Sequence, residues 1–303
     1  MSRSAERQLR PPTFHSPSRE WKLPWLLLAP TILALLALSI YPLIYAVKVS
    51  LQIGADESAR WSVQNFTRLA ADRFFFAALG HTLVYAVVAL TCEFLLGLGL
   101  AVLLNTRLRG RNLFRAGLLV PMMLPPVVVG VVWRLMLNPN FGAINGTLKG
   151  AGLSALAPAW TASPKLALFS VIMVDVWQWT PFMFLVLLAG LQAIPQEPYE
   201  AALVDGSSSW QTFKFVTLPL LKPAILIALL LRTMDLLRVF DQIFILTEGG
   251  PGLATETISL YIYRAAFRFS DFGYAAAMSF VLLILTNIIS LLYIRLLQQQ
   301  EAA

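Results

Sequence analysis

Four charged residues recur at every third position in an otherwise apolar stretch toward the C-terminal end of the chain: Arg232, Asp235, Arg238 and Asp241. Residues three apart are neighbours on a helix, so adjacent members of this series can form ion pairs. Three such steps turn a helix by about half a circle, so the four side chains spiral around it. Two interpretations stay open: structural ion pairs, or a polar lining that contacts a substrate.

A second polar segment, residues 195–219, separates two apolar stretches. Pro198 suits the first turn of a short helix. Gly206 suits its end, because glycine adopts left-handed backbone angles at little cost. Such a helix would expose Glu200 and Asp205, where Arg or Lys of a partner protein could pair with them. An ordinary loop with a turn is the alternative.

Motifs of known catalytic or metal chemistry are missing from the sequence. It has no G-x-x-x-x-G-K-[ST] for nucleotide phosphates, no H-E-x-x-H and no G-x-S-x-G. The single cysteine, Cys92, allows no disulfide within the chain, and His15 and His81 form no metal-ligand pattern. We therefore expect no enzyme activity, no metal and no cofactor in this chain.

The composition indicates a membrane protein. Of the 303 residues, 58% are hydrophobic and 13% charged, and the apolar residues form long blocks. Each block can cross about 30 Å of hydrocarbon, and only a helix satisfies its own backbone hydrogen bonds there. We predict six spans, at Trp25–Val47, Ala77–Leu104, Leu113–Leu137, Leu166–Leu191, Leu220–Leu246 and Tyr274–Ile294. The first is too long for a signal peptide and is expected to be retained. The expected fold class is therefore all-α, with one membrane domain at residues 25–297.

The net charge of +7 comes from Arg and Lys in short segments between spans, a pattern of membrane topology and not of nucleic-acid binding. The tail 1–24 and the loop 105–115 are the richest in arginine, so the positive-inside rule makes both cytoplasmic. By alternation, segment 195–219 and the C-terminal tail 298–303 are also cytoplasmic.

The segment between the fourth and fifth spans resembles the E-A-A loop of ABC-importer permeases, E-A-A-x-x-x-G-x₉-I-x-L-P. It departs only at Val216, where Ile is usual, and its matching residues are Glu200, Ala201, Ala202, Gly206, Leu218 and Pro219. In that family the loop docks into a cleft of the ATP-hydrolysing subunit. The resemblance implies that these residues, with the adjacent Asp205, couple this chain to an ATPase that binds ATP and Mg.

The fourth and fifth spans resemble the first permease of carbohydrate importers of the maltose and trehalose type. The resemblance rests on runs such as residues 175–182, 232–241, 246–251 and 261–264, and it covers nearly the whole membrane part. It implies import of a sugar by alternating access in a prokaryotic cytoplasmic membrane. It also implies a second permease, an ATPase dimer and an extracytoplasmic sugar-binding protein as partners.

The family's sugar site lies within the membrane between the two permeases. A sugar offers hydroxyls to polar side chains and C–H faces to aromatic rings, so Trp177, Gln178 and Trp179 near Asp175 are candidates to line the pathway. Helix packing or an interfacial aromatic belt is the alternative. The charged residues 232, 235, 238 and 241 are further candidates, whereas Glu93 and Arg134 are expected mainly to form structural pairs.

Three other functions remain as alternatives. Buried acids (Glu93, Asp175 and Asp235) would suit an ion-coupled secondary transporter. Close relatives within the family import glycerol 3-phosphate or other polyols. A membrane-bound enzyme would act without any partner.

Overall fold

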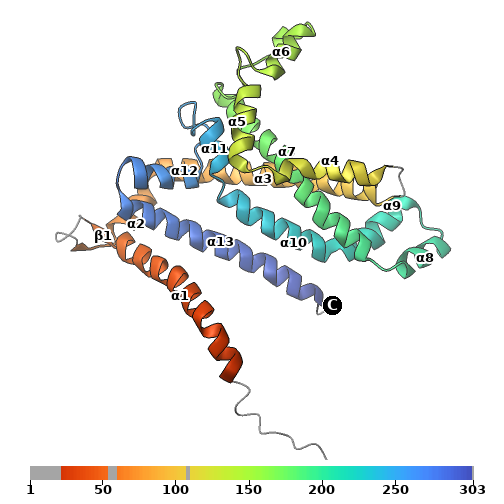
Figure 1. The fold of residues 1–303 in the computed structure, drawn as a ribbon, viewed down its shortest axis with the longest axis horizontal. Coiled ribbons are helices and arrows are strands. Elements are labelled where there is room, and N and C mark those ends of the chain that lie inside the picture. The colour runs from red at the N-terminus through yellow and green to blue at the C-terminus, as the bar shows by residue number, and fades with distance from the viewer. Residues whose placement is uncertain (1–21, 54–59, 107–109, 302–303) are drawn as a thin grey trace, which may run out of the picture.

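The computed structural model describes residues 22–53, 60–106 and 110–301, so most of the predicted tail 1–24 lies outside the described residues. The chain is almost entirely helical (Figure 1). A two-residue antiparallel pair joins β1 (Gln52–Ile53) to β2 (Arg60–Trp61). The helices are α1 (Lys22–Ser50), α2 (Gln64–Ala71), α3 (Arg73–Asn105), α4 (Arg111–Met123), α5 (Pro126–Met136), α6 (Ala143–Gly150), η2 (Ser154–Leu156), α7 (Pro164–Ala193), α8 (Glu197–Val204), α9 (Ser209–Thr212), η3 (Phe213–Thr217), α10 (Leu218–Leu237), α11 (Asp241–Leu246), α12 (Ile258–Tyr263), η4 (Arg264–Arg268) and α13 (Phe272–Glu301).

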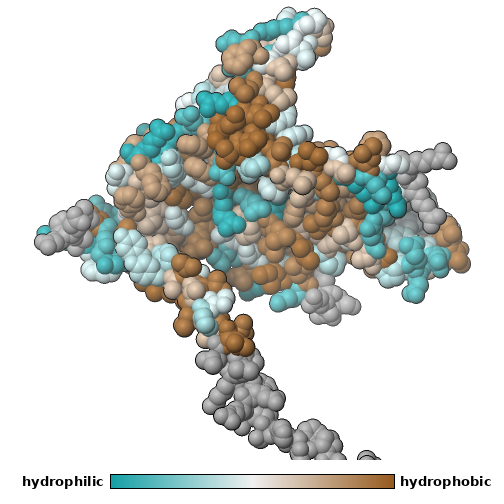
Figure 2. Space-filling model, in the orientation of Figure 1, coloured by the Kyte–Doolittle hydropathy of each residue, from teal (hydrophilic) through white to brown (hydrophobic). Residues whose placement is uncertain are grey.

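Five helical segments of the described chain are long and apolar enough to cross a membrane, and a bent pair makes a possible sixth. The five lie within α1, α3, α7, α9–α10 and α13. Hydrophobic residues cover much of the helical body, apart from a hydrophilic patch near its middle, and hydrophilic residues gather at the tips around α6 and α8 (Figure 2). The protein is therefore an α-helical membrane protein, as its sequence predicts.

The third predicted span is not one straight helix. It divides into α4 and α5, which meet at an angle of 95°. Leu124 ends α4 in an extended conformation, and Pro125 and Pro126 follow. Proline has no N–H to donate, and it disfavours helical angles in the residue before it, so the two prolines end one helix and begin the next.

The fifth predicted span also ends early. α10 stops at Leu237 and α11 begins at Asp241, so Arg238 and Asp241 do not continue the helix that carries Arg232. The break lets α11 turn onto α5 and bury Ile243 and Leu246 in the main core. Burial of that apolar face outweighs continuation of the helix.

α10 continues α9 and η3 without a break, so residues Ser209–Leu237 form one helical run. Within it, Phe213–Thr217 adopts a π-helical turn just before Pro219. A proline clashes with the carbonyl four residues before it, and a wider turn relieves that clash. Pro181, in contrast, lies inside an uninterrupted α7.

α3 and α7 form the central packing pair of the fold. They approach closely at Gly97, where an added Cβ would lie 2.6 Å from Met183 Cβ and 2.9 Å from the backbone nitrogen of Phe184. A second close approach, of α7 to α10, occurs at Gly190, 2.6 Å from Ala224 Cβ on the same measure. Small residues therefore bring the backbones of α3, α7 and α10 together, as in other membrane bundles.

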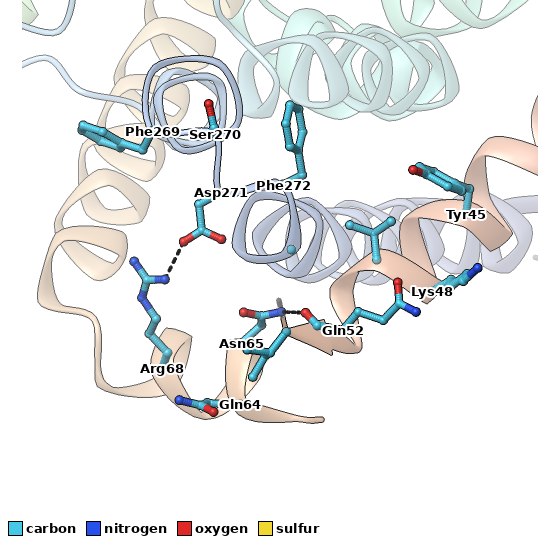
Figure 3. Close-up of a pocket in the computed structure, with 13 residues that line it drawn as sticks. Tyr45, Lys48, Gln52, Gln64, Asn65, Arg68, Phe269, Ser270, Asp271 and Phe272 are labelled. Carbon is cyan, nitrogen blue, oxygen red and sulfur yellow. Dashed lines mark hydrogen bonds and ion pairs between the residues drawn. The ribbon is translucent and has the colours of Figure 1, made fainter. Parts of the chain in front are cut away.

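α1 meets the rest of the chain mainly through α13 and splays away from it toward its N-terminal end (Figure 1). A polar cavity of about 900 Å³ lies at this corner, between the end of α1, α2 and the start of α13 (Figure 3). Asn65 Nδ2 donates to the carbonyls of Ser50 (2.9 Å) and Gln52 (3.0 Å). Arg68 pairs with Asp271 at 2.6 Å. These contacts attach the C-terminal end of α1 to α2 and α13.

Next to this corner, Asp72 caps α3 and ties α12 and α13 to it. Its carboxylate accepts hydrogen bonds from the hydroxyls of Tyr261 (2.6 Å) and Tyr274 and from the backbone N–H of Phe74 (2.8 Å). Burial raises the pKa of Asp72, but the hydrogen bonds to its ionised form outweigh burial and leave this pKa below its ordinary value.

Candidate functional site

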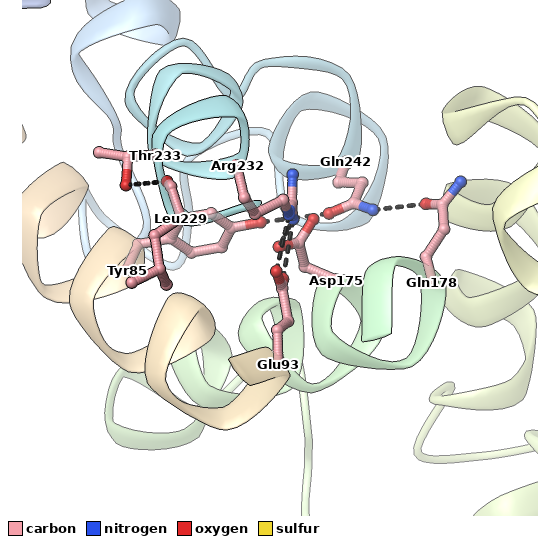
Figure 4. A network of polar contacts seen from close by, with 8 residues as sticks. All are labelled: Tyr85, Glu93, Asp175, Gln178, Leu229, Arg232, Thr233 and Gln242. Carbon is pink, nitrogen blue, oxygen red and sulfur yellow. Dashed lines mark hydrogen bonds and ion pairs between the residues drawn. The ribbon is translucent and has the colours of Figure 1, made fainter. Parts of the chain in front are cut away.

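A buried ion network joins the three central helices (Figure 4). Arg232 of α10 donates from Nε to Glu93 Oε2 (2.7 Å) and from Nη2 to Glu93 Oε1 (2.8 Å) on α3. Its Nη2 also donates to Asp175 on α7. All three side chains are at most 3% exposed. A bidentate guanidinium–carboxylate pair fixes orientation as well as charge, so this network locks α3, α7 and α10 in register.

A chain of neutral polar groups adjoins the ion network. The hydroxyl of Tyr85 donates to Gln242 Oε1 at 3.2 Å, and Gln242 Nε2 donates to Gln178 Oε1 at 2.6 Å. Gln178 Nε2 in turn donates to the carbonyl of Leu124 at 2.9 Å. The chain therefore runs from α3 through α11 and α7 to the break between α4 and α5, where it satisfies a carbonyl that the bend frees.

A cavity of about 390 Å³ opens against the ion network. Two aromatic residues, Trp179 and Phe240, are part of its lining. Trp179 also stacks on Arg232, with the guanidinium carbon 4.9 Å from the ring centroid. The remaining lining is Pro126, Asp175, Asp235, Arg238, Val239, Asp241 and Gln242. Aromatic faces beside hydroxyl-binding groups can hold a molecule with both apolar C–H surface and many hydroxyls.

Most of the substrate-pathway residues proposed from the sequence meet at this cavity: Asp175, Trp179, Arg232, Asp235, Arg238 and Asp241. Two do not line it. Trp177 faces an apolar groove beside α4 and packs edge-to-face on Trp133, at 5.4 Å between centroids. Gln178 is buried behind the cavity wall, where it holds Gln242.

The ion pairs in the structure differ in part from those that helical spacing favours. Arg232 pairs with Glu93 and Asp175 and not with its neighbour Asp235. Asp235 and Arg238 do pair, loosely, at 3.8 Å and with both side chains more than half exposed. Arg134 lies near the end of α5, where it donates to the carbonyl of Ile245 (3.1 Å).

Sequence reasoning did not find Tyr85, Gln242 or Phe240 as part of the site. Gln242 stands among apolar residues next to Asp241, and that contrast was a usable signal. Tyr85 had none, because an aromatic residue in an apolar stretch is ordinary. Among residues 22–53, 60–106 and 110–301, no group of three or more His, Cys, Asp or Glu could hold a metal ion.

The segment with the E-A-A pattern forms a short protruding element at one tip of the molecule (Figure 1). Pro198 lies in the first turn of α8, and Gly206 follows the helix with φ +71°. The N–H of Ser207 donates to the carbonyl of Ala202 at 3.0 Å, which closes the helix end. Ser208 then caps α9 through a reciprocal bond with Gln211. Two tight caps hold this element in one shape.

The protruding element exposes most of its side chains. Glu200, Ala201, Asp205 and Gly206 are exposed, and Ala202 is buried. The apolar side chains of Leu203, Val204 and Trp210 are each at least 70% exposed. Apolar groups presented to solvent on a rigid element indicate an interaction surface.

The structure combines apolar helices long enough to span a membrane, a polar cavity beside a buried ion network and a rigid protruding element. Residues 93–301 match the family of binding-protein-dependent transport system inner membrane components. The trehalose/maltose transport system permease protein MalF of Thermococcus litoralis is 40% identical over 91% of this chain and 94% of its own length.

Solved structures agree with this match. The crystal structure of a bacterial ABC transporter involved in the import of the acidic polysaccharide alginate contains a chain with a TM-score of 0.81 and 25% identity, covering 93% of this chain and 96% of that one. The bacterial alginate ABC transporter in complex with an alginate pentasaccharide-bound periplasmic protein gives a TM-score of 0.78 at 26% identity, covering 91% and 93%.

This chain belongs to the family of binding-protein-dependent transport system inner membrane components. It is a multi-pass inner-membrane permease subunit of an ABC importer and not an enzyme.

Proposed function

We propose that this permease imports a sugar, with the disaccharides trehalose and maltose as first candidates, through the cavity beside Arg232. The observation that carries the proposal is the joint lining of that cavity. Trp179 and Phe240 offer ring faces to sugar C–H groups, and the polar side chains around them offer partners for hydroxyls. The trehalose/maltose permease of T. litoralis supports the choice of disaccharide.

The chain spans the membrane six times in this proposal, with α4 and α5 together forming the third, broken span. Both termini and the α8–α9 element face the cytoplasm, as the arginine distribution indicates. The membrane domain covers residues 25–297, between the tails 1–24 and 298–303, although α13 itself continues to Glu301. Sugar passes by alternating access, in which the cavity opens to one side of the membrane at a time.

The α8–α9 element docks on a partner ATPase dimer, which binds ATP and Mg. Glu200 and Asp205 supply exposed carboxylates for basic groups of that partner, and Gly206 lets the chain turn back sharply. Ala201 is exposed and small enough for close contact, whereas the buried Ala202 supports α8 from inside. Leu218 and Pro219 join the element to α10 and therefore to the cavity.

The proposed assembly contains a second permease, which completes the cavity, and an extracytoplasmic sugar-binding protein, which delivers the sugar. The alginate transporter, solved with its periplasmic protein, supports the last partner. Trp177 stays a candidate for the pathway, since the residue is 41% exposed and lines the groove beside α4. Gln178 would act through Gln242, which it orients.

The test is uptake of labelled trehalose, maltose and glycerol 3-phosphate by cells with and without this gene. Selective loss of trehalose or maltose uptake is the expected result. Loss of glycerol 3-phosphate uptake alone would overturn the sugar proposal. Uptake that persists when the partner ATPase is inactivated would favour an ion-coupled transporter instead.

A further inference from the structure

The cavity beside Arg232 has more carboxylates than cations. Its lining includes the carboxylates of Asp175, Asp235 and Asp241 and the guanidiniums of Arg232 and Arg238. Glu93 lies directly behind Arg232 and adds another carboxylate. Four carboxylates around two guanidiniums give a formal charge of −2.

Protein groups already engage most donors of Arg232 and, more loosely, part of Arg238. Glu93 occupies the Nε–Nη2 fork of Arg232, which is the geometry that would otherwise grip a phosphate or carboxylate of a ligand. The other N–H of Nη2 donates a hydrogen bond to Asp175. Arg238 donates from Nε to the carbonyl of Met234 (3.1 Å) and faces Asp235.

One part of Arg232 remains free for a ligand. Its Nη1 carries two N–H donors that make no hydrogen bond to any residue of the described chain. Figure 4 shows a guanidinium nitrogen that points away from the two carboxylates. An N–H donor whose positive charge is matched twice over can bond a neutral hydroxyl but gives no net attraction to an anion.

Resting on the proposed function above, we propose that this cavity selects uncharged glycosides and rejects sugars that carry a phosphate, sulfonate or carboxylate. Glu93, Asp175 and Asp241 are the specificity-determining residues. Glu93 and Asp175 neutralise Arg232 and hold its fork away from the ligand. Asp241 adds a negative charge to the cavity lining and forms no ion pair with any residue that the structure describes. The similar alginate transporter is involved in the import of an acidic polysaccharide, so a shared fold does not by itself fix the charge of the substrate.

Coulomb's law sets the size of the effect. A carboxylate about 7 Å from a bound monoanion, at an effective dielectric constant of about 20, weakens its binding roughly 50-fold. With all four carboxylates ionised, the formal charge of −2 therefore predicts discrimination of at least about 100-fold between a neutral sugar and its phosphate.

The experiment compares trehalose with trehalose 6-phosphate, which share one sugar skeleton and differ in charge. Equilibrium binding of each is measured on the purified permease–ATPase assembly without the sugar-binding protein, so that only the membrane cavity discriminates. Glu93→Gln keeps a hydrogen-bonding group beside Arg232 but removes one charge. Asp241→Asn removes an exposed charge that belongs to no buried network, so folding is expected to be unaffected. Glu248→Gln, an exposed carboxylate outside the cavity, is the matched control.

The wild-type assembly is expected to favour trehalose by at least about 100-fold. The preference should fall about tenfold or more in Glu93→Gln and at least about threefold in Asp241→Asn, and it should not change in Glu248→Gln. Equal binding of the two sugars by the wild type, or an unchanged preference in Asp241→Asn, would overturn the inference. Failure of the proposed function would appear separately, as sugar uptake in cells that does not depend on the gene.

Discussion

Arg232→Met is expected to destabilise the protein strongly. The substitution removes three charge-assisted hydrogen bonds and leaves Glu93 and Asp175 facing each other, at 0% and 2% side-chain exposure. Removing one partner of a buried ion pair costs about 3–5 kcal/mol, mostly because the other charge stays buried and unpaired. Protonation of one carboxylate limits the loss, so we expect it to stay within this range.

The measurement is thermal unfolding in detergent, followed by the loss of monodisperse protein. With an unfolding entropy of about 2.1 cal/mol/K per residue, a change of 1 kcal/mol moves the midpoint of this 303-residue chain by about 1.6 °C. Arg232→Met should therefore lower the midpoint by roughly 5–8 °C. Arg238→Met is the matched control for stability. Its side chain is 63% exposed and its pair with Asp235 is loose, so the loss should stay below about 1 kcal/mol.

A triple variant separates charge from packing. Arg232→Met combined with Glu93→Leu and Asp175→Leu replaces the whole network by apolar side chains and should recover most of the stability. If Arg232→Met unfolds within about 1 kcal/mol of Arg238→Met, the buried network does not hold the three helices together and the reasoning fails.

Three further predictions concern other parts of the fold. Gly97→Leu should destabilise the protein by at least about 2 kcal/mol in thermal unfolding, since the new Cβ would overlap Met183. Gly99→Leu is the control and should be tolerated, because there is open space around Gly99. Equal effects of the two substitutions would contradict the close approach of α3 and α7. Glu200→Ala should insert normally but reduce co-purification of the ATPase severalfold, and Glu197→Ala in the same turn should not; normal transport by Glu200→Ala would refute the assigned docking role. Asp72→Ala should destabilise most at neutral pH and progressively less below about pH 4, because the lowered pKa of Asp72 stabilises the fold only while the carboxylate is ionised; a loss that does not depend on pH would count against this role.

Hydropathy predicts the membrane helices well because the bilayer leaves the backbone few choices. The second, fourth and sixth predicted spans correspond to α3, α7 and α13, which extend beyond them by a few residues. The bend between α4 and α5 also had a local signal, in Pro125 and Pro126. The end of α10 at Leu237 had none, since no proline or glycine stands near it. Burial of α11 against α5 decides it.

The ion-pair partners of Arg232 could not be predicted from its neighbours in the sequence. Spacing along the helix favours Asp235, three residues away, but the actual acceptors lie 139 and 57 residues away in the sequence. A bidentate contact to a fully buried carboxylate outweighs a loose contact at the surface of the cavity. Six of the eight proposed pathway residues still meet at one cavity, because polar side chains in a bilayer gather away from lipid.

The unbroken helical run from Ser209 to Leu237 sets a fixed phase between the two ends of the protein. At about 1.5 Å per residue it is a rod of some 43 Å, with the α8 tip at one end and Arg232 near the other. The π turn at Phe213–Thr217 contains about one residue more than an α-helical turn would. Deleting one residue there would restore a regular α-helix and leave Arg232 close to its present phase. Deleting one residue between Leu218 and Arg232, where the helix is already regular, would rotate Arg232 by about 100° relative to the α8 tip and away from Glu93 and Asp175. Evolution can therefore change the side chains along this rod one at a time, but it can change its length only in steps that restore the same phase.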